Sequence, residues 1–277
     1  MASTISTTSI SSTLSKSYNS LISRIRSRPR NADVATTSTA IAALALSLSI
    51  AWVIHDYHDW KAFGTGGTPP TWAGYWRMTK IRINRAIRRV QLLGKDDLTD
   101  PTTLSAIEGP RHLDADKIPV RGGDRPTLVS RTMPQRQVPY DSEQLEPGVA
   151  ERIRNMTADF AAKYPDILDL KLSKTEGYSA NAIYAKKNLP TLNEKAKRDK
   201  LLGTEIAHHH PSELSFHVWL SEADAKTVVE KGWGQKFPMP SVDKGWVMLY
   251  APRTMAEVDV VERIVEAAIA WVAGVEV

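Results

Sequence analysis

The sequence predicts an α+β fold, an antiparallel sheet with flanking helices, preceded by one N-terminal transmembrane helix. Residues 34–54 carry no charge, the middle of residues 148–277 alternates between apolar and polar positions, and both ends of that region show helical periodicity. A strand-rich centre between helices is typical of α+β domains. We therefore expect a disordered tail at 1–33, a transmembrane helix at 34–54, a basic amphipathic helix and linker at 55–124, and a folded domain at 125–277.

The composition excludes several kinds of site. The 277 residues include no cysteine, which excludes disulfides, zinc–thiolate sites, iron–sulfur clusters and cysteine nucleophiles. The 36 basic and 31 acidic residues give a net charge of +5. Because many of the basic residues gather beside the apolar segment, they indicate a membrane as partner and no nucleic acid.

The uncharged segment 34–54 is long enough to cross a membrane. Its 21 residues, at about 1.5 Å each, cover a hydrocarbon core of about 30 Å. Residues 1–32 are rich in Ser, Thr and Arg and contain no acidic residue. This composition predicts a disordered tail or, alternatively, a mitochondrial-type presequence.

Residues 71–93 predict a basic amphipathic helix. Trp72, Trp76, Ile83 and Ile87 recur near helical spacing, with six Arg and Lys residues on the remaining turns. Such a helix binds anionic headgroups; the alternative is a solvated helix packed on the folded domain. We expect a single-pass membrane protein of the endoplasmic reticulum with a cytosolic C-terminal domain, although the arginines before the span favour the inverse topology. A mitochondrial membrane is the alternative location.

The folded domain is expected to begin and end with helices. Apolar residues between Val149 and Phe160 follow one helical face, and capping boxes at Ser221 and Thr254 predict two further helix starts. Strands are predicted at 167–173, near 181–184, and at 203–210, 214–220 and 246–250. We expect an extended wrapping segment at 95–147, a surface loop at 188–200 and a short aromatic turn at 232–234.

Three histidines are predicted to converge on one face of the sheet. If residues 203–210 and 214–220 form an antiparallel hairpin, His208 lies opposite His217. His210 shares their face and His209 faces away, because side chains alternate along a strand. Imidazoles can act as general bases near neutral pH. They can equally hold a metal with open positions, or they can be histidines without chemistry.

Several segments resemble the fungal luciferase family. They are EIAHHHPSELSFHVWL (205–220), KGWGQKFPM (231–239), LYAPR (249–253) and VVERIVEAAIAW (260–271), with RPTLVSRTMPQRQ (125–137) and, more weakly, SKTEGYSANAIY (173–184). The resemblance covers about 125–271, and the N-terminal span matches the layout of the family.

The resemblance implies a luciferase-like, membrane-associated oxygenase that uses O2 as co-substrate and needs neither a metal nor an organic cofactor. The implied substrate is a small phenolic hydroxypyrone such as 3-hydroxyhispidin, which is converted with loss of carbon dioxide. Light emission stays open, because the turn at 211–213 and Phe237 depart from the luminous members. A histidine-metal oxygenase or hydrolase, and a non-catalytic membrane-tethered binding module, are the alternatives.

The expected site residues divide into two groups. A histidine among His208, His210 and His217 is expected to deprotonate the enolic hydroxyl. The expected substrate-binding residues are Glu176, Glu205, Trp219, Trp233, Tyr250 and Arg253. Of these, Glu176 and Arg253 orient an anionic substrate or form an ordinary ion pair.

Overall fold

The computed structural model describes residues 30–91, 97–129, 136–239 and 242–277. The chain divides after Asp56 into two compact units. Most of the predicted tail at 1–33 lies outside the described residues. The predicted division into four parts stays a prediction.

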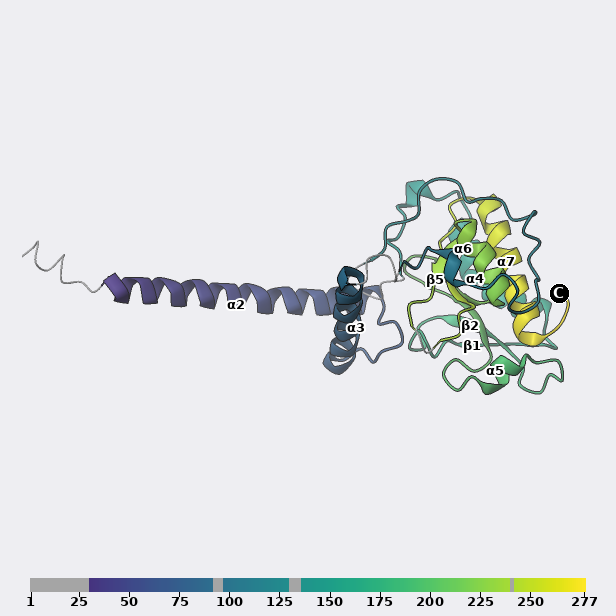
Figure 1. Cartoon of the computed structure of the whole chain (residues 1–277), viewed down its shortest axis with the longest axis horizontal. Coiled ribbons are helices and arrows are strands. Elements are labelled where there is room, and N and C mark those ends of the chain that lie inside the picture. The colour runs from purple at the N-terminus through teal and green to yellow at the C-terminus, as the bar shows by residue number, and fades with distance from the viewer. Residues whose placement is uncertain (1–29, 92–96, 130–135, 240–241) are drawn as a thin grey trace, which may run out of the picture. The chain divides into compact units, whose positions relative to one another are not determined.

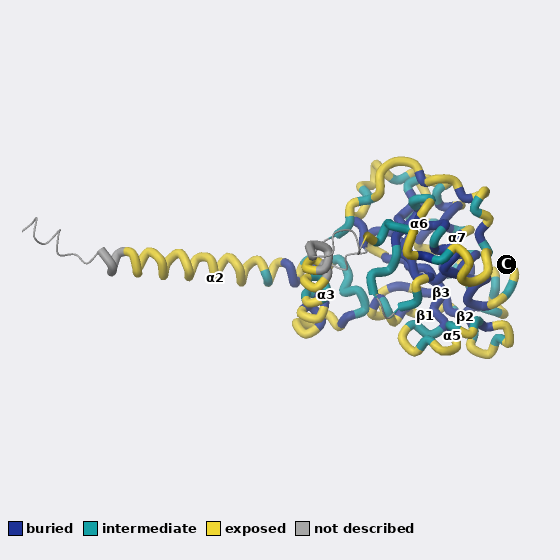
Figure 2. Tube along the Cα trace, viewed as in Figure 1, coloured by how far each residue is buried: buried dark blue, intermediate teal, exposed yellow. Residues whose placement is uncertain are grey.

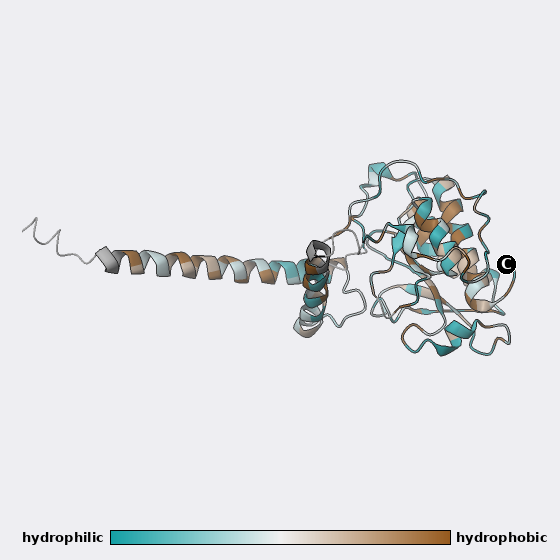
Figure 3. Ribbon diagram, viewed as in Figure 1, coloured by the Kyte–Doolittle hydropathy of each residue, from teal (hydrophilic) through white to brown (hydrophobic). Residues whose placement is uncertain are grey.

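The N-terminal unit contains most of helix α2, which runs from Arg30 to Phe63 (Figure 1). From Val34 to Phe63 the helix has a mean hydropathy of 1.9 in its most apolar window, and none of that window is buried. Figure 2 shows this exposure along the tube, and Figure 3 shows the apolar residues spread along the same stretch. Among the described residues, this is the one helix long and apolar enough to cross a membrane, by length and composition. It continues past the predicted end at Ile54.

The basic helix is present as α3 (Trp72–Gln91), and residues 92–93 of the prediction lie outside the described residues. Tyr75 and Met78 on its inner face are buried. The Trp72 ring stacks on Tyr57 with centroids 4.0 Å apart, and Trp60 is fully buried beside them. The last turns of α2 and the start of α3 thus form one aromatic cluster within the C-terminal unit.

The C-terminal unit contains a six-stranded antiparallel sheet with strand order β1-β2-β3-β4-β6-β5 (Figure 1), which confirms the predicted α+β class. The strands are β1 (Leu168–Leu172), β2 (Asn181–Ala185), β3 (Glu205–His209), β4 (Phe216–Trp219), β5 (Gly234–Lys236) and β6 (Trp246–Leu249). Five were predicted. The sequence predicts only an aromatic turn at 232–234 where the short β5 begins, because three residues are too few to show alternation. A side chain at Gly234 would collide with the Met248 carbonyl, so the glycine permits this pairing.

Helices α4 (Val149–Lys163) and α7 (Met255–Ala273) pack against one another and against the central strands, where Ile153, Met156 and Ile264 are fully buried. Helix α6 (Glu222–Glu230) packs against β5. The Ser221 and Thr254 hydroxyls accept hydrogen bonds from the first turns of α6 and α7, which confirms both predicted helix starts.

The predicted surface loop at 188–200 is wrong in part, because it contains the short helix α5 (Glu194–Arg198). The Asn193 side chain accepts a hydrogen bond from the Lys195 amide and caps this helix. Leu192 and Ala196 are buried. The many charges of the segment conceal these two apolar anchors in the sequence.

In its described residues, 97–129 and 136–147, the predicted wrapping segment consists of turns, bends and irregular backbone with two short 3-10 helices, Pro101–Thr103 (η1) and Ser142–Gln144 (η2). Backbone amides of His112 and Leu113 donate to the Asp224 carboxylate. The Trp233 indole donates to the Pro119 carbonyl at 2.7 Å. These long-range hydrogen bonds fasten the segment to α6 and to the start of β5.

Candidate active site

One row of side chains crosses the sheet on the histidine-bearing face. Strand register places His208 opposite both Ala182 and His217, and Met248 opposite both His217 and Gln235. Residues directly opposite one another in an antiparallel sheet share a face. This register confirms the predicted pairing of His208 with His217.

The turn between β3 and β4 brings a third ring to this face. The His210 amide donates to the Ser215 carbonyl at 2.8 Å, and Leu214 has a φ of 65°, which is rare for a residue with a side chain. The ring centroids of His210 and His217 are 4.5 Å apart, and that of His208 lies 5.3 Å from His210 and 5.1 Å from His217. His209 instead pairs with Phe216 on the alternate face. The predicted convergence of three histidines without His209 is confirmed.

The Nδ1 nitrogens of two histidines, called the outer nitrogens below, form hydrogen bonds. His208 Nδ1 lies 2.6 Å from Glu205 Oε1. His210 Nδ1 lies 2.7 Å from Ser215 Oγ and 3.1 Å from Glu213 Oε1. These contacts fix the orientation of both rings.

The Nε2 nitrogens of the three rings, called the inner nitrogens below, have no such partner. The Nε2 atoms of His208, His210 and His217 are buried, and none has a hydrogen-bond partner among the residues that the structure describes. Glu176 Oε1 lies 3.7 Å from the Nε2 of His208 and 3.5 Å from that of His210. The site therefore has a polar centre formed by three imidazole nitrogens and one carboxylate oxygen.

A buried arginine connects two of the carboxylates beside the rings, Glu213 and Glu176. Arg136, which is 1% exposed, donates from Nε and Nη2 to both oxygens of Glu213. Its Nη1 donates to Glu176 Oε2 at 3.1 Å. Arg136 thereby leaves Glu176 Oε1 turned toward the histidines. The guanidinium also lies over the Phe63 ring, 5.0 Å from its centroid.

Glu205 has a separate set of hydroxyl donors. Tyr184 donates to Glu205 Oε2 at 2.6 Å, and Ser173 donates to Oε1 at 3.0 Å, with Thr175 at 3.2 Å. Charge-assisted hydrogen bonds of this kind favour the ionised carboxylate. Glu205 therefore orients His208 as a fixed anion.

Burial and neighbouring charges shift the pKa values of His208 and His217 in opposite directions when no metal is bound. Burial disfavours charge on His208, but its contacts with Glu176 and Glu205 outweigh burial and raise its pKa to about 9. Burial and the positive charges of His210 and His208 hold the pKa of His217 well below its usual value. At neutral pH and without a metal, His208 is protonated and His217 is a neutral imidazole.

The carboxylates stay ionised despite their burial. Burial opposes the charge on Glu213, but His210 and Arg136 lower its pKa to about 2. Burial also opposes the charge on Glu176, and the same two residues together with His208 hold its pKa well below the usual value. Ionised carboxylates therefore surround the inner nitrogens of the cluster.

The structure brings only part of the predicted substrate-binding set into this cluster. Glu176 and Glu205 belong to it. The other four make contacts elsewhere. Trp219 donates to Asp243 and stacks on Trp246, and Trp233 donates to the Pro119 carbonyl. The Tyr250 hydroxyl donates to Gln235, and Arg253 pairs with Glu257. Arg253 and Glu176 thus each have another partner, and their roles in substrate binding stay predictions.

Several residues that contact the cluster are not among the predicted site residues: Tyr184, Ser173 and Thr175 donate to Glu205, and four others lie near the rings. Arg136, Glu213 and Ser215 hold the polar groups. Phe237 places its ring edge-on to His217, with centroids 4.9 Å apart. Arg136, Glu213, Ser215 and Phe237 all lie in segments that resemble the fungal family, and this resemblance is the signal that could have identified them.

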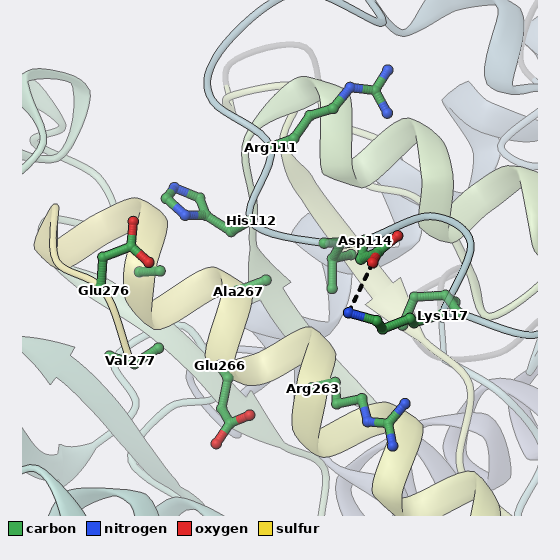
Figure 4. Close-up of a pocket in the computed structure, with 12 residues that line it drawn as sticks. Arg111, His112, Asp114, Lys117, Arg263, Glu266, Ala267, Glu276 and Val277 are labelled. Carbon is green, nitrogen blue, oxygen red and sulfur yellow. Dashed lines mark ion pairs between the residues drawn. The ribbon is translucent and has the colours of Figure 1, made fainter.

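A separate surface pocket of about 400 Å³ lies between residues 111–118 and α7 (Figure 4). Figure 4 shows Arg111, Lys117 and Arg263 around it, with the Asp114–Lys117 ion pair drawn as a dashed line. None of the cluster residues lines this pocket. The histidine cluster and this pocket are distinct sites.

Residues 203–268, which carry all three clustered histidines, match the family described as "Luciferase domain". The chain belongs to the fungal luciferase-like family. It is 30% identical over 257 residues to a luciferase of Armillaria ostoyae, an alignment that covers 87% of this chain and 89% of that protein. It is 29% identical over 268 residues to a luciferase of Neonothopanus nambi, covering 92% and 93%. No solved structure matches the chain.

Proposed function

We propose that this enzyme uses O2 to oxidise a small enolic aromatic, a hydroxypyrone of the 3-hydroxyhispidin type. The observation that carries the proposal is the buried cluster of His208, His210 and His217 inside the segment that matches the luciferase domain. The relatives named as luciferases support an enzyme that uses oxygen. Light emission is a separate property of this chain, and the assay below measures it independently of O2 consumption.

The cluster suits the first chemical step. An enolic hydroxyl must lose its proton before the electron-rich anion reacts with O2. Without a metal, the neutral His217 ring can accept this proton, and the His208 imidazolium can stabilise the resulting anion. The Phe237 ring excludes water on the His217 side. O2 then adds to the substrate, and carbon dioxide leaves.

The helical segments support a membrane-anchored enzyme. We expect α2 to cross the membrane by its length and composition. Trp76, Ile83 and Ile87 are exposed on α3, beside the exposed basic residues Arg77 and Lys80. An apolar stripe beside basic residues favours binding to an anionic membrane surface. We propose the cytosolic face of the endoplasmic reticulum, where a small phenolic substrate can diffuse to the site.

A direct assay tests the proposal. The full-length protein in detergent receives 3-hydroxyhispidin in air, and light and O2 consumption are recorded together. We expect O2 consumption, and replacing His217 by Ala should lower its rate by about 10²–10⁴-fold, the usual contribution of a base. His209→Gln is the control and should retain the rate. Binding of hydroxypyrones without O2 consumption would instead indicate a non-catalytic binding module.

The need for a metal is a separate question. The resemblance implies a reaction without metal or organic cofactor, and this stays a prediction. The unpartnered nitrogens of the cluster favour a second candidate, a histidine-metal oxygenase or hydrolase.

A further inference from the structure

We propose that Glu176, His208, His210 and His217 bind one divalent first-row transition-metal ion. One potential ligand atom from each of these four buried residues lies within 4.8 Å of the other three. The role of the ion in oxidation rests on the proposed function, but the existence of the site does not. The argument for it uses the tautomers of the rings, their geometry, the position of Glu176 and the buried charge.

The hydrogen bonds place the proton of a neutral His210 on its outer nitrogen, Nδ1. Ser215 Oγ donates to Glu213 Oε1 at 3.0 Å, so this hydroxyl accepts from His210 Nδ1–H. In a neutral imidazole one nitrogen is a donor and the other an acceptor. When His210 is neutral, as a metal ligand must be, its lone pair therefore lies on Nε2. His208 Nδ1–H donates to Glu205 in the same way, as metal-binding histidines commonly do toward a carboxylate.

The ring geometry fits a common centre. Three imidazoles bonded through Nε2 at about 2.1 Å, with ring centroids about 1.1 Å beyond, would have centroids about 4.5–5.2 Å apart for bond angles of about 90–110°. The observed separations are 4.5, 5.1 and 5.3 Å. Interplanar angles of 73–90° let the three rings approach one point edge-on.

Glu176 is positioned as a one-oxygen ligand. Arg136 occupies Oε2 and leaves Oε1 turned toward the rings. The distances of 3.5 and 3.7 Å from Oε1 to two Nε2 atoms exceed by a little the roughly 3.3 Å between ligand atoms around a tetrahedral ion with bonds of about 2.0–2.1 Å. A small inward movement of side chains would complete the coordination.

The buried charge also calls for a cation. Glu176, Glu205 and Glu213 are buried carboxylates, and Arg136 is the buried guanidinium paired with two of them. With the three imidazoles neutral, as metal ligands must be, these four groups leave two negative charges, which one divalent ion would neutralise. Without a metal, the proton on His208 offsets part of this costly buried charge instead.

Three imidazoles and one carboxylate suit iron(II), manganese(II), cobalt(II) or zinc(II). An ion that accepts five or six ligands would keep positions for oxygen atoms of a substrate. The ion would then supply the positive charge that attracts an enolate oxygen, in place of a proton on His208.

Cobalt(II) provides a direct test because its visible absorption reports coordination. The full-length protein, purified in detergent without a polyhistidine tag and stripped with a chelator, is titrated with Co²⁺ in the absence of substrate. We expect one equivalent to produce d–d bands and to raise the melting temperature, since an ion that binds only the folded state stabilises it. Metal analysis of the protein before stripping identifies the native ion.

Matched variants assign the site. His217→Ala and Glu176→Gln should each lose at least about tenfold in Co²⁺ affinity, and Glu205→Gln should lose about 10–100-fold as a positioning change. His209→Gln, which alters a neighbouring histidine on the other face, should bind Co²⁺ as the unchanged protein does. Far-UV circular dichroism checks that each variant is folded.

Two results would overturn the metal site: no stoichiometric Co²⁺ binding by the unchanged protein, or equal affinity in the His217→Ala and His209→Gln variants. The unchanged protein alone decides the first, so a variant that fails to fold does not remove the test. O2 consumption by a protein that binds no metal would refute the metal site and keep the proposed function. Metal binding without O2 consumption with any hydroxypyrone would refute the proposed function and keep the metal site.

Discussion

Replacing Arg136 by Ala should destabilise the folded protein strongly. The change removes a guanidinium that is 1% exposed and leaves Glu213 and Glu176 buried without their cationic partner. Breaking a buried ion pair from one side costs about 3–5 kcal/mol, because the remaining charge is uncompensated. The bidentate contact with Glu213 and the additional bond to Ser212 indicate the upper part of this range.

Thermal unfolding measures this cost. A destabilisation of this size lowers the melting temperature by about 6–20 °C, at about 2–4 °C per kcal/mol for a domain of this size. The measurement uses the metal-free, full-length protein in detergent, followed by circular dichroism. Arg136→Lys should recover part of the loss, since lysine keeps the charge but cannot make the bidentate contact.

A second arginine gives the control. Arg152 also pairs with two carboxylates, Asp159 and Glu262, but its side chain is 38% exposed. Exposed ion pairs contribute about 0–1 kcal/mol, so Arg152→Ala should change the melting temperature by only a few degrees. Equal shifts for Arg136→Ala and Arg152→Ala would refute the argument that burial determines the cost.

Three further changes test other parts of the structure. Gly67→Ala should lower both stability and O2 consumption, because its Cβ would collide with the Thr175 carbonyl, next to Glu176. The control Gly122→Ala adds a methyl group in open space and should have little effect. Similar losses in both variants would contradict this reasoning. Thr254→Ala removes the cap of α7 and should cost about 1 kcal/mol in thermal unfolding, and no measurable loss would refute the role of the cap. Pro190→Thr completes a glycosylation sequon at the exposed Asn188, and we expect no glycosidase-sensitive mobility shift in cells; a shift would place the domain in the lumen.

The central hairpin could be predicted because its information is local. The alternation of Phe216, His217 and Val218 determines which face each side chain takes, and a short turn determines the register with His208. The same alternation predicts that His209 lies on the opposite face of the sheet from the cluster. The helix starts at Ser221 and Thr254 were equally local, since a cap and its partner lie three residues apart.

The rest of the site could not be predicted because its contacts join distant segments. Arg136 reaches Glu213 across 77 residues and Glu176 across 40. No periodicity within either segment indicates such a pairing. Glu176 was selected as a possible anion-orienting residue, yet its partner is Arg136 and not Arg253. A buried polar network is determined by tertiary packing, whereas helix and strand patterns reflect neighbours along the chain.

The contact between the end of α2 and the site has a practical consequence for anyone preparing a soluble form of the enzyme. The Ser212 hydroxyl donates to the Phe63 carbonyl, and Gly67 lies against the Thr175 backbone, next to Glu176. Cutting the chain anywhere between Phe63 and the start of α3 would remove residues that contact Ser212 and the Thr175–Glu176 segment of the candidate site, along with the proposed anchor. A truncated enzyme should therefore begin before Tyr57, and a fusion that replaces the membrane anchor should keep everything from that residue onward.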